Sequence, residues 1–396
     1  MVSCLVPSKR GTPEMPKRIK ARQKDMFQRI TSETNQHQAL RKCLESDEKY
    51  SLEAILFVMN ETRNMMDLRQ ELISGSYKFS GYMRFKVYEP KERIVDAPHF
   101  RDKIVQIALN NVLKEFFNEI FIYDSYACID NKGTHKAVDR INYFIRKAKW
   151  EYGEEAQINK FDIEKFFYTI DRKILKQILI KRVMCKRTKD LLFKIIDSAD
   201  SISELGLPLG NTLSQICANI YMNELDQYCK RVLKVKYYVR YADDIIVMAS
   251  DKEEAVFYNE KIISFLNERL HLKANAKKTK VFSINQGVNS VGFKIYATHR
   301  LLRNDSKKKI KRKARKMKGL IHTGKMKPEK AEQILNSWHG HARHGCSYNF
   351  IEKQLIGKHG FIYVSRKGTI KIDEKQIRKD DDDAILERGK TEPVAV

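Results

Sequence analysis

The sequence predicts an α+β protein in which helices surround an antiparallel β-sheet. Apolar residues recur at helical spacing through most of the chain, and a few short β-rich runs interrupt them. Two of these runs, 236–240 and 245–248, are separated only by the tight turn Tyr241-Ala242-Asp243-Asp244, which is typical of a β-hairpin. At 396 residues the chain is long enough to divide into two or three subdomains.

The N-terminal part combines an arm, several helices and one hairpin. Residues 1–25 are basic and contain three prolines, so we expect an arm without regular structure. Helical spacing follows over 26–75, for example at Leu52, Ile55, Leu56 and Met59. The period changes to two over 80–97, which predicts a second hairpin with a turn at 89–92. One face of this hairpin is expected to carry Tyr82, Arg84 and Lys86.

The same two periods predict the remaining elements. Helices are expected at 102–122, 135–149, 171–199, 212–230, 252–269 and 328–337. Strands are expected at 157–163, 279–284 and 290–297, with short strand-like runs at 360–364 and 369–372. The run 307–318 consists almost entirely of Lys and Arg, and we expect it to be helical. The residues His339, His341, His344 and Cys346 lie within eight positions of one another, but no second cluster completes a zinc site.

The charge of the chain indicates the class of its partner. Lys and Arg number 76 against 50 Asp and Glu, which gives a net charge of +26. So large an excess favours a polyanion such as nucleic acid, although solubility alone is the alternative explanation. No apolar run approaches the roughly 18–20 residues of a membrane span, so we expect no membrane partner. The seven cysteines are scattered and no signal peptide is evident, which favours reduced thiols and a cytoplasmic location.

Two acidic positions carry the chemistry that we predict. Asp243 and Asp244 occupy the turn between two apolar runs, and Asp162 ends a predicted buried strand. Each has an ordinary explanation, because Asp favours exposed turns and also caps helices. Together they fit phosphoryl transfer from a nucleotide, which needs two divalent ions roughly 4 Å apart. Carboxylates from two strands that meet at one end of a sheet can bridge two Mg²⁺ ions, with Mn²⁺ as a substitute.

These residues and their order resemble those of reverse transcriptases, over about residues 50–300. The resemblance implies a right-hand polymerase that adds deoxynucleotides to the 3′-hydroxyl of a DNA or RNA primer on an RNA template. It implies fingers at 26–155, a palm at 156–300 that includes helices within 172–205, and a basic helical thumb at 301–350. Residues 1–25 would remain an N-terminal arm and 351–396 a C-terminal extension.

The resemblance also implies roles for individual residues. Asp162, Asp243 and Asp244 correspond to the metal-binding acids, and Ile163 beside the first acid is expected at the same metal site. Lys278 corresponds to a basic residue near the pyrophosphate and is expected to act as a general acid. Phe167 corresponds to a steric gate against the 2′-hydroxyl, with plain core packing as the alternative. The hairpin residues expected to hold the triphosphate, unless they form only a solvated basic face, are Lys86, Lys91 and Arg93.

The loop 206–215 indicates the subfamily. Many reverse transcriptases have Gln where Leu209 stands, before Gly210, and Pro where Gln215 stands. The form found here resembles diversity-generating retroelements, which copy a template RNA with errors for targeted mutagenesis and would involve an accessory RNA-binding protein. Phage-defence reverse transcriptases carry similar loops, so copying of a non-coding RNA or untemplated polymerisation is the alternative. A non-catalytic nucleic-acid-binding protein is the second alternative.

Overall fold

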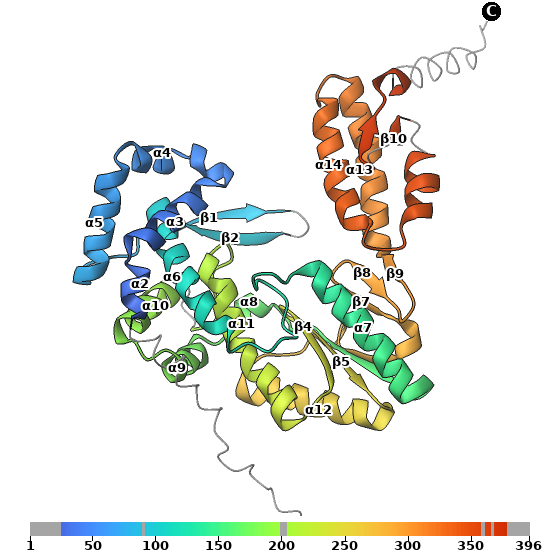
Figure 1. Cartoon of the computed structure of the whole chain (residues 1–396), viewed down its shortest axis with the longest axis horizontal. Coiled ribbons are helices and arrows are strands. Elements are labelled where there is room, and N and C mark those ends of the chain that lie inside the picture. The colour runs from blue at the N-terminus through green and yellow to red at the C-terminus, as the bar shows by residue number, and fades with distance from the viewer. Residues whose placement is uncertain (1–24, 89–91, 199–203, 358–360, 366–367, 378–396) are drawn as a thin grey trace, which may run out of the picture. The chain divides into compact units, whose positions relative to one another are not determined.

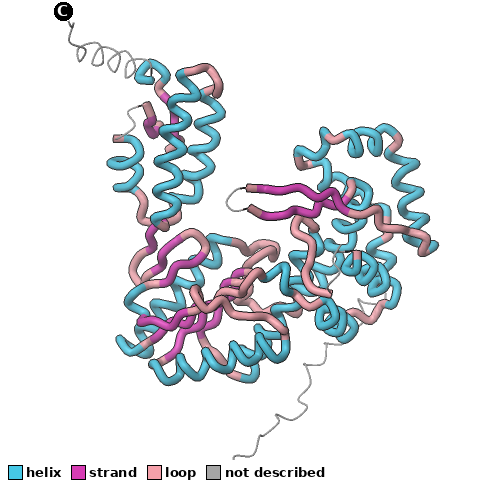
Figure 2. Tube along the Cα trace, turned by 180° about the vertical axis from the view of Figure 1, so that it is seen from behind, coloured by secondary structure: helices cyan, strands magenta, loops and turns pink. Residues whose placement is uncertain are grey.

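The computed structural model describes residues 25–88, 92–198, 204–357, 361–365 and 368–377 (Figure 1). Two compact units divide the chain. The first unit comprises Met1–Asn131, Phe161–Ile245 and Val256–Lys280, and the second comprises Lys132–Lys160, Ile246–Ala255 and Val281–Val396. Helices and strands mix along the chain, so the predicted α+β class is confirmed (Figure 2).

Five helices open the first unit: α2 (Met26–Ile30), α3 (Glu33–Leu44), α4 (Leu52–Met59), α5 (Glu61–Ser74) and α6 (Phe100–Asn118). Serine side chains fix two of the starts, because the Ser32 and Ser51 hydroxyls accept the N–H groups of the third residue along, as N-caps do. Helix α6 is buried along most of its length, and α3 packs against it. The hairpin predicted over 80–97 lies between α5 and α6 in the sequence.

The apolar stripe of α4 faces outward. Its periodicity correctly predicted a helix, yet Leu52 and Met59 are 70% and 73% exposed, while Ala54 and Phe57 fill the contact with the rest of the unit. Spacing alone therefore located the helix but not the face that it buries. Nothing in the described chain shows what covers this stripe.

The predicted second hairpin consists of β1 (Tyr82–Val87) and β2 (Arg93–Pro98), paired antiparallel from Tyr82 opposite Pro98 to Val87 opposite Arg93. Its strands are mostly exposed on both faces. Because side chains alternate along a strand, Lys86 lies on the face of its partner Ile94, and Arg93 lies on the other face.

The main sheet has four strands in the order β4-β5-β3-β6. They are β3 (Gln157–Phe161), β4 (Tyr237–Tyr241), β5 (Asp244–Ala249) and β6 (Lys280–Ser283). Strands β4 and β5 are almost wholly buried, as their runs of Tyr, Val and Ile require. Four helices accompany the sheet in sequence: α9 (Arg172–Arg182), α10 (Lys186–Asp197), α11 (Thr212–Gln227) and α12 (Lys252–Arg269).

The second unit begins with helix α7 (Thr134–Tyr152), which packs against β8. The strands β7 (Val288–Ser290), β8 (Phe293–Ile295) and β9 (Arg300–Leu302) form a three-stranded sheet. This replaces the single strand predicted over 290–297, because Gly292 at φ +89° turns the chain between β7 and β8.

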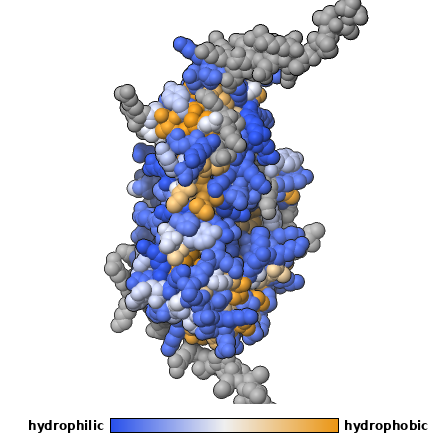
Figure 3. Space-filling view, turned by 90° about the vertical axis from the view of Figure 1, so that its right-hand side faces the viewer, coloured by the Kyte–Doolittle hydropathy of each residue, from blue (hydrophilic) through white to orange (hydrophobic). Residues whose placement is uncertain are grey.

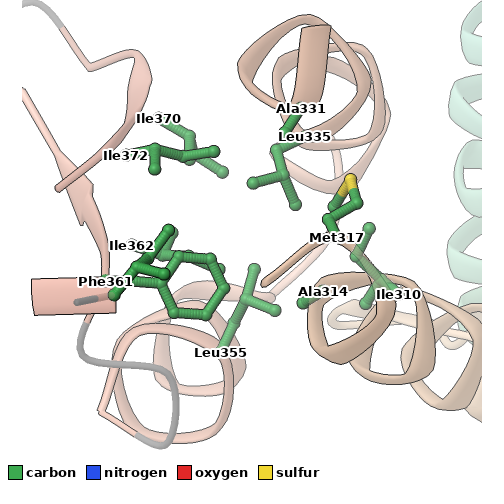
Figure 4. Close-up of a cluster of buried hydrophobic side chains, with 11 residues drawn as sticks. Ile310, Ala314, Met317, Ala331, Leu335, Leu355, Phe361, Ile362, Ile370 and Ile372 are labelled. Atoms are coloured by element: carbon green, nitrogen blue, oxygen red, sulfur yellow. The ribbon is translucent and has the colours of Figure 1, made fainter. Parts of the chain in front are cut away.

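A separate core ends the second unit. Helices α13 (Asn304–His322) and α14 (Pro328–Ala342) pack with the hairpin β10 (Ile362–Val364) and β11 (Ile370–Ile372). Figure 4 shows the side chains that converge there, including Ile310, Met317, Leu335, Leu355, Phe361 and Ile370. The predicted basic run therefore forms the outer part of α13, whose buried side consists of Ile310, Ala314 and Met317.

Two of the spaced histidine and cysteine positions near the end of α14, His341 and His344, belong to a ring cluster. His344 stacks on His135 with 3.6 Å between ring centroids, and His341 packs on Phe293 at 4.5 Å. No group of three or more His, Cys, Asp or Glu in the described chain is arranged to hold a metal ion.

Figure 3 shows one face on which hydrophilic residues dominate and apolar residues form small separate groups. None of the helices within the described ranges combines the length and the apolar character that crossing a membrane requires.

Candidate active site

The acidic turn joins the two most buried strands of the main sheet. Only Ala242 and Asp243 separate β4 from β5, and Asp244 is the first residue of β5. Ala242 adopts φ +55°, a left-handed conformation that non-glycine residues rarely adopt. Strained backbone of this kind persists only where the surroundings fix it, and functional sites are where it concentrates.

A fully buried arginine fixes this turn. The Arg240 guanidinium donates to both carboxylate oxygens of Asp226 on α11, from Nε at 2.8 Å and from Nη2 at 2.7 Å. Its remaining nitrogen, Nη1, donates to the Asn219 side chain at 3.0 Å and to the Ala242 carbonyl at 3.1 Å. Tyr238 also donates to Asp226, at 2.6 Å. One ion pair therefore ties the turn to helix α11.

The free edge of β4 is covered by the segment 124–126. Arg240 N–H donates to the Asp124 carbonyl at 2.9 Å, and Tyr126 N–H donates to the Arg240 carbonyl at 3.0 Å. Ser125 thereby forms a parallel bridge with Arg240. The segment acts as a short additional strand beside the strand that carries the acidic turn.

Asp162 directly follows β3, and a lysine holds its carboxylate. Lys278 Nζ lies 2.9 Å from Asp162 Oδ1 and 2.8 Å from Oδ2. The Asp162 carbonyl accepts the Asn275 N–H at 2.7 Å, and the neighbouring Ile163 forms an antiparallel bridge with Ala274. The segment 274–278 is thus fixed against the first acid. Asp162 is only 15% exposed, whereas the Lys278 side chain is 54% exposed.

The two acidic positions interact electrostatically. The pKa of Asp243 is raised, first because burial disfavours its charge, and further because Asp162 and Asp244 are negative neighbours. Lys278 acts in the opposite direction. Lys278 contacts Asp162, and β3, which Asp162 follows, pairs with β5, which Asp244 begins, so the structure brings together four predicted residues, Asp162, Asp243, Asp244 and Lys278.

The donor set suits hard divalent cations. Carboxylate oxygens are the ligands that Mg²⁺ prefers, and a cation would relieve the repulsion that Asp162 and Asp244 exert on Asp243. Ile163 is buried and has no side-chain oxygen, so only its main-chain carbonyl can serve as a ligand. Across the described ranges, no group of three or more His, Cys, Asp or Glu is already arranged to hold a metal ion. The Lys278 ammonium supplies the positive charge at Asp162 instead.

Phe167 lies on α8 (Phe166–Thr169), a short helix after the first acid. Its ring is half-buried and meets the buried Phe166 edge-on, with 5.4 Å between centroids. The Phe167 carbonyl accepts the Leu207 N–H at 2.8 Å. The predicted gate is therefore attached through its backbone to the loop that was used to predict the subfamily.

The same loop is bonded to the β1–β2 hairpin. The Leu209 carbonyl accepts the Asp96 N–H at 2.6 Å, and Asn211 donates to the Tyr82 hydroxyl at 2.9 Å. Gly210 has φ +101°, and a Cβ there would lie 2.6 Å from the Val95 side chain, so only glycine fits. Gln215 is exposed on the first turn of α11.

Two of the predicted triphosphate-binding residues, Lys86 and Arg93, lie near the end of the paired part of the hairpin. Lys86 pairs with Glu92 at 3.0 Å, and both side chains are more than half exposed. Arg93 is exposed on the opposite face from Lys86. Lys91 lies outside the described residues. The basic residues of this hairpin are therefore divided between two faces rather than gathered on one.

Sequence reasoning missed the network behind the turn. The sequence predicts a β-rich run that includes Arg240 and a helix that includes Asp226, but it indicates no role for either residue. The available signal was an arginine within an otherwise apolar strand, since a buried charge needs a partner. The identity of that partner depends on how α11 lies against β4, and spacing does not reveal this.

Known proteins decide the family. A family model described as reverse transcriptase (RNA-dependent DNA polymerase) matches residues 86–295, which is more than half of the chain. This chain belongs to the reverse transcriptase family. Its matched domain includes both acidic positions, the loop 206–215 and Lys278, and the family confirms the right-hand polymerase fold and the predicted enzyme class, RNA-directed DNA polymerase.

Relatives of this reverse transcriptase are distant. Protein YkfC of Escherichia coli is 26% identical over 283 residues, which cover 61% of this chain and 71% of YkfC. The group II intron-encoded protein LtrA of Lactococcus lactis subsp. cremoris is 22% identical over 297 residues, covering 57% of this chain and 48% of LtrA. An apo telomerase structure from Candida tropicalis has a TM-score of 0.44 at 13% identity, covering 58% of this chain and 49% of the telomerase chain.

Proposed function

We propose that the whole chain acts as an RNA-directed DNA polymerase that adds deoxynucleotides to a primer 3′-hydroxyl on an RNA template. The observation that carries this proposal is the convergence of Asp162 with Asp243 and Asp244 beside Lys278. Two magnesium ions held by these carboxylates and the Ile163 carbonyl would activate the attacking hydroxyl and stabilise the leaving pyrophosphate, with Mn²⁺ as a substitute.

The protein groups then have separate tasks. The Arg240–Asp226 pair orients the turn that presents Asp243 and Asp244. Lys278 neutralises Asp162 before substrate binds, and its exposed ammonium can give a proton to the departing pyrophosphate. The hairpin residues Lys86, Lys91 and Arg93 would contact the triphosphate, because cationic side chains bind phosphate oxygens strongly.

The loop 206–215 supports the subtype that we propose. Leu209 stands where many reverse transcriptases have Gln, and its backbone joins the loop to the hairpin. Error-prone copying of a retroelement RNA, with an accessory RNA-binding protein, fits this substitution. A phage-defence enzyme that copies a non-coding RNA or polymerises without template is the second candidate, because the exposed Gln215 is common to both loop types.

The predicted parts of the polymerase hand remain part of this proposal: fingers at 26–155, palm at 156–300, thumb at 301–350 and an extension at 351–396. The basic outer side of α13 supports the thumb assignment, because lysines there suit a nucleic-acid backbone. The cysteines within the described ranges are free thiols, which supports a cytoplasmic location.

Primer extension with Mg²⁺ on an RNA template tests the activity. The double variant Asp243→Asn/Asp244→Asn should lose at least about a thousandfold in rate, because the amides cannot hold the ions. Asp67→Asn is the matched control, since Asp67 is an exposed acid on α5, and it should leave the rate unchanged. Equal incorporation by the double variant and the wild type would overturn the assignment.

Sugar selection tests the role of Phe167. Phe167→Ala should admit ribonucleotides, raising the ratio of ribonucleotide to deoxynucleotide incorporation by about tenfold or more, since a methyl group leaves room for the 2′-hydroxyl. Tyr168→Ala is the neighbouring control, because Tyr168 is 46% exposed on the same short helix. An unchanged ratio in Phe167→Ala would leave only a packing role for this ring.

Sequencing distinguishes the subtypes. RNA that co-purifies from native expression, together with its DNA product, should show adenine-directed errors if the chain serves a retroelement. Faithful copies of one non-coding RNA, or products without a template match, would favour the defence role. A Leu209→Gln variant should lower the error frequency if this position acts in base selection.

A further inference from the structure

Helix α7 carries a largely exposed stripe of cationic and aromatic residues. Lys136, Arg140, Tyr143, Lys147 and Trp150 follow one another at intervals of four, three, four and three residues, so they occupy one side of the helix. The opposite side consists of buried residues that pack into the second unit, namely Ala137, Val138, Ile141, Phe144, Ile145 and Ala148. None of the five stripe residues belongs to the proposed active site.

The aromatic members of this stripe are unusually exposed. Trp150 is 82% exposed, the highest value among the exposed large apolar side chains of the described residues, and Tyr143 is 40% exposed. A tryptophan buries more apolar area than other side chains when it is covered, so leaving it in water has a cost in free energy. The other tryptophan, Trp338, is instead packed on Phe350 and bonded to Ser306.

Cations lie beside both rings. Lys147 Nζ is 5.2 Å from the centre of the Trp150 ring, and the Arg140 guanidinium carbon is 5.4 Å from the centre of the Tyr143 ring. Arg140 also lies over the ring of Phe144, at the border with the buried side of the helix, with 4.2 Å to the ring centre. Ring faces and positive charges therefore alternate from Arg140 to Trp150, over about 15 Å of helix.

Cations outnumber acids on this helix, which carries five Lys or Arg residues and two acids. Asp139 is paired with Arg300 at 2.6 Å, and Glu154 is bonded to Asn285 and paired with Lys149. Glu151, beside Trp150, is the remaining acid of this helix. The stripe thus remains positive overall and rich in ring surface.

We infer that this stripe is a second binding surface for single-stranded nucleic acid, separate from the proposed polymerase site. Bases whose faces are free stack on exposed aromatic rings, and the neighbouring lysines and arginines contact the phosphates. A duplex hides its base faces, so it could use only the charges. A protein partner would leave the alternation of cations and rings unexplained, whereas a single strand presents a phosphate and a base at each step.

Tryptophan fluorescence tests the surface directly, because the chain has two tryptophans and only one lies on the stripe. In a Trp338→Phe variant, titration with a short oligouridylate at low ionic strength should quench the emission to saturation. The difference between wild type and Trp150→Phe gives the same signal if Trp338→Phe does not fold. An oligodeoxythymidylate of equal length shows whether RNA or DNA is preferred, and a duplex of equal length should quench much less.

The affinity for single-stranded nucleic acid should depend on several stripe residues together. Tyr143→Ala/Lys147→Ala should weaken the quenching transition by about tenfold or more, as expected for one lost stacking contact and one lost phosphate contact. Phe257→Ala/Lys261→Ala on α12 is the matched control, because it removes a cation–ring pair with the same four-residue spacing. Saturating the polymerase site with a primer–template should leave the quenching intact.

Three results would overturn the inference: binding without any change in Trp150 emission, equal quenching by the duplex, or an equal loss in the α12 control. Each of these would leave primer extension untouched. Failure of the stripe and failure of the polymerase assignment are therefore distinguishable.

Discussion

Asp243 combines a catalytic position with an unfavourable electrostatic environment. Its pKa is raised by burial and then by the negative charges of Asp162 and Asp244. A carboxyl whose pKa is raised in the folded state stabilises the fold at low pH, and it loses this contribution as the pH rises through the raised pKa. At neutral pH and without metal, its ionised form therefore destabilises the protein.

We predict that Asp243→Asn raises the melting temperature of the metal-free protein at neutral pH by a few degrees, while abolishing primer extension. The difference between variant and wild type should vanish at a pH below the ordinary aspartate pKa, where both side chains are neutral. Mg²⁺ should then stabilise the wild type more than the variant, since the cation favours the ionised carboxylate. Thermal melts at several pH values with and without Mg²⁺ provide the measurement, and a lower neutral-pH melting temperature in Asp243→Asn would contradict the reasoning.

Arg240 should determine rate more than substrate binding. Its Nη1 holds the Ala242 carbonyl at 3.1 Å, yet the guanidinium is fully buried and cannot reach a nucleotide. We predict that Arg240→Lys, which keeps the charge but loses the fork of donors, lowers kcat by about tenfold to a hundredfold with little change in KM for the deoxynucleotide.

The controls separate orientation of the turn from loss of stability. Tyr238→Phe removes one hydrogen bond to Asp226 and leaves the turn contact, so it should cost about 1 kcal/mol of stability and little activity. Arg240→Ala leaves Asp226 buried without its ion-pair partner and should cost about 3–5 kcal/mol. A rise in KM without a fall in kcat for Arg240→Lys would assign the residue to nucleotide binding instead.

The site could be predicted from sequence where chemistry is local. Two adjacent acids between apolar runs predicted the turn, and Asp162 after a strand predicted its partner. The contacts that hold them could not be predicted. The Lys278–Asp162 pair joins residues 116 positions apart, and the Arg240–Asp226 pair depends on how a helix lies against a strand.

Gly210 shows how loop and hairpin depend on each other. Gly210→Ala would place a methyl group against Val95 at a left-handed φ of +101°, so it should push the loop away from β2. We predict a destabilisation of about 1–3 kcal/mol and a raised KM for deoxynucleotides, because the hairpin loses its anchor at Leu209. Chemical denaturation and steady-state kinetics measure the two effects.

Gly81→Ala is the matched control for this variant. Gly81 has a similar φ of +108°, but nothing lies within 4 Å of a Cβ there. It should show the backbone strain without the collision. If both variants changed KM equally, contact between loop and hairpin would not be the cause.

Helices and strands were predicted well where the helical or strand periodicity of apolar residues extended over enough positions. The helix at 252–269 was predicted with its observed limits, and the hairpin at 80–97 was found as β1 and β2. Short pieces were missed, such as β9, whose three residues are too few to show a period. Periodicity also did not distinguish the exposed stripe of α4 from a core face, because both have the same spacing.

The net charge of +26 should make nucleic-acid binding strongly dependent on salt. We predict that Lys308→Gln/Arg312→Gln/Arg315→Gln, on the exposed side of α13, weakens primer–template binding. It should also reduce the slope of log K against log salt by up to about three, one for each lost phosphate contact. Fluorescence anisotropy at several salt concentrations measures both quantities.

A charge-matched variant on the N-terminal helices, Arg41→Gln/Lys42→Gln/Arg63→Gln, is the comparison. It removes the same formal charge, so it shows what general electrostatic attraction contributes. If its slope fell as far as that of the α13 variant, the charge of the entire protein rather than one helix would govern binding.

The segment beside β4 has a consequence for solubility in the cell. An outermost strand with open N–H and C=O groups is a template on which a second chain can polymerise into an aggregate. Asp124 and Tyr126 occupy these groups at Arg240, and the side chains of β4 are buried except at Tyr241. The segment 124–126 should therefore reduce self-association through the edge of β4, the strand that leads into the acidic turn.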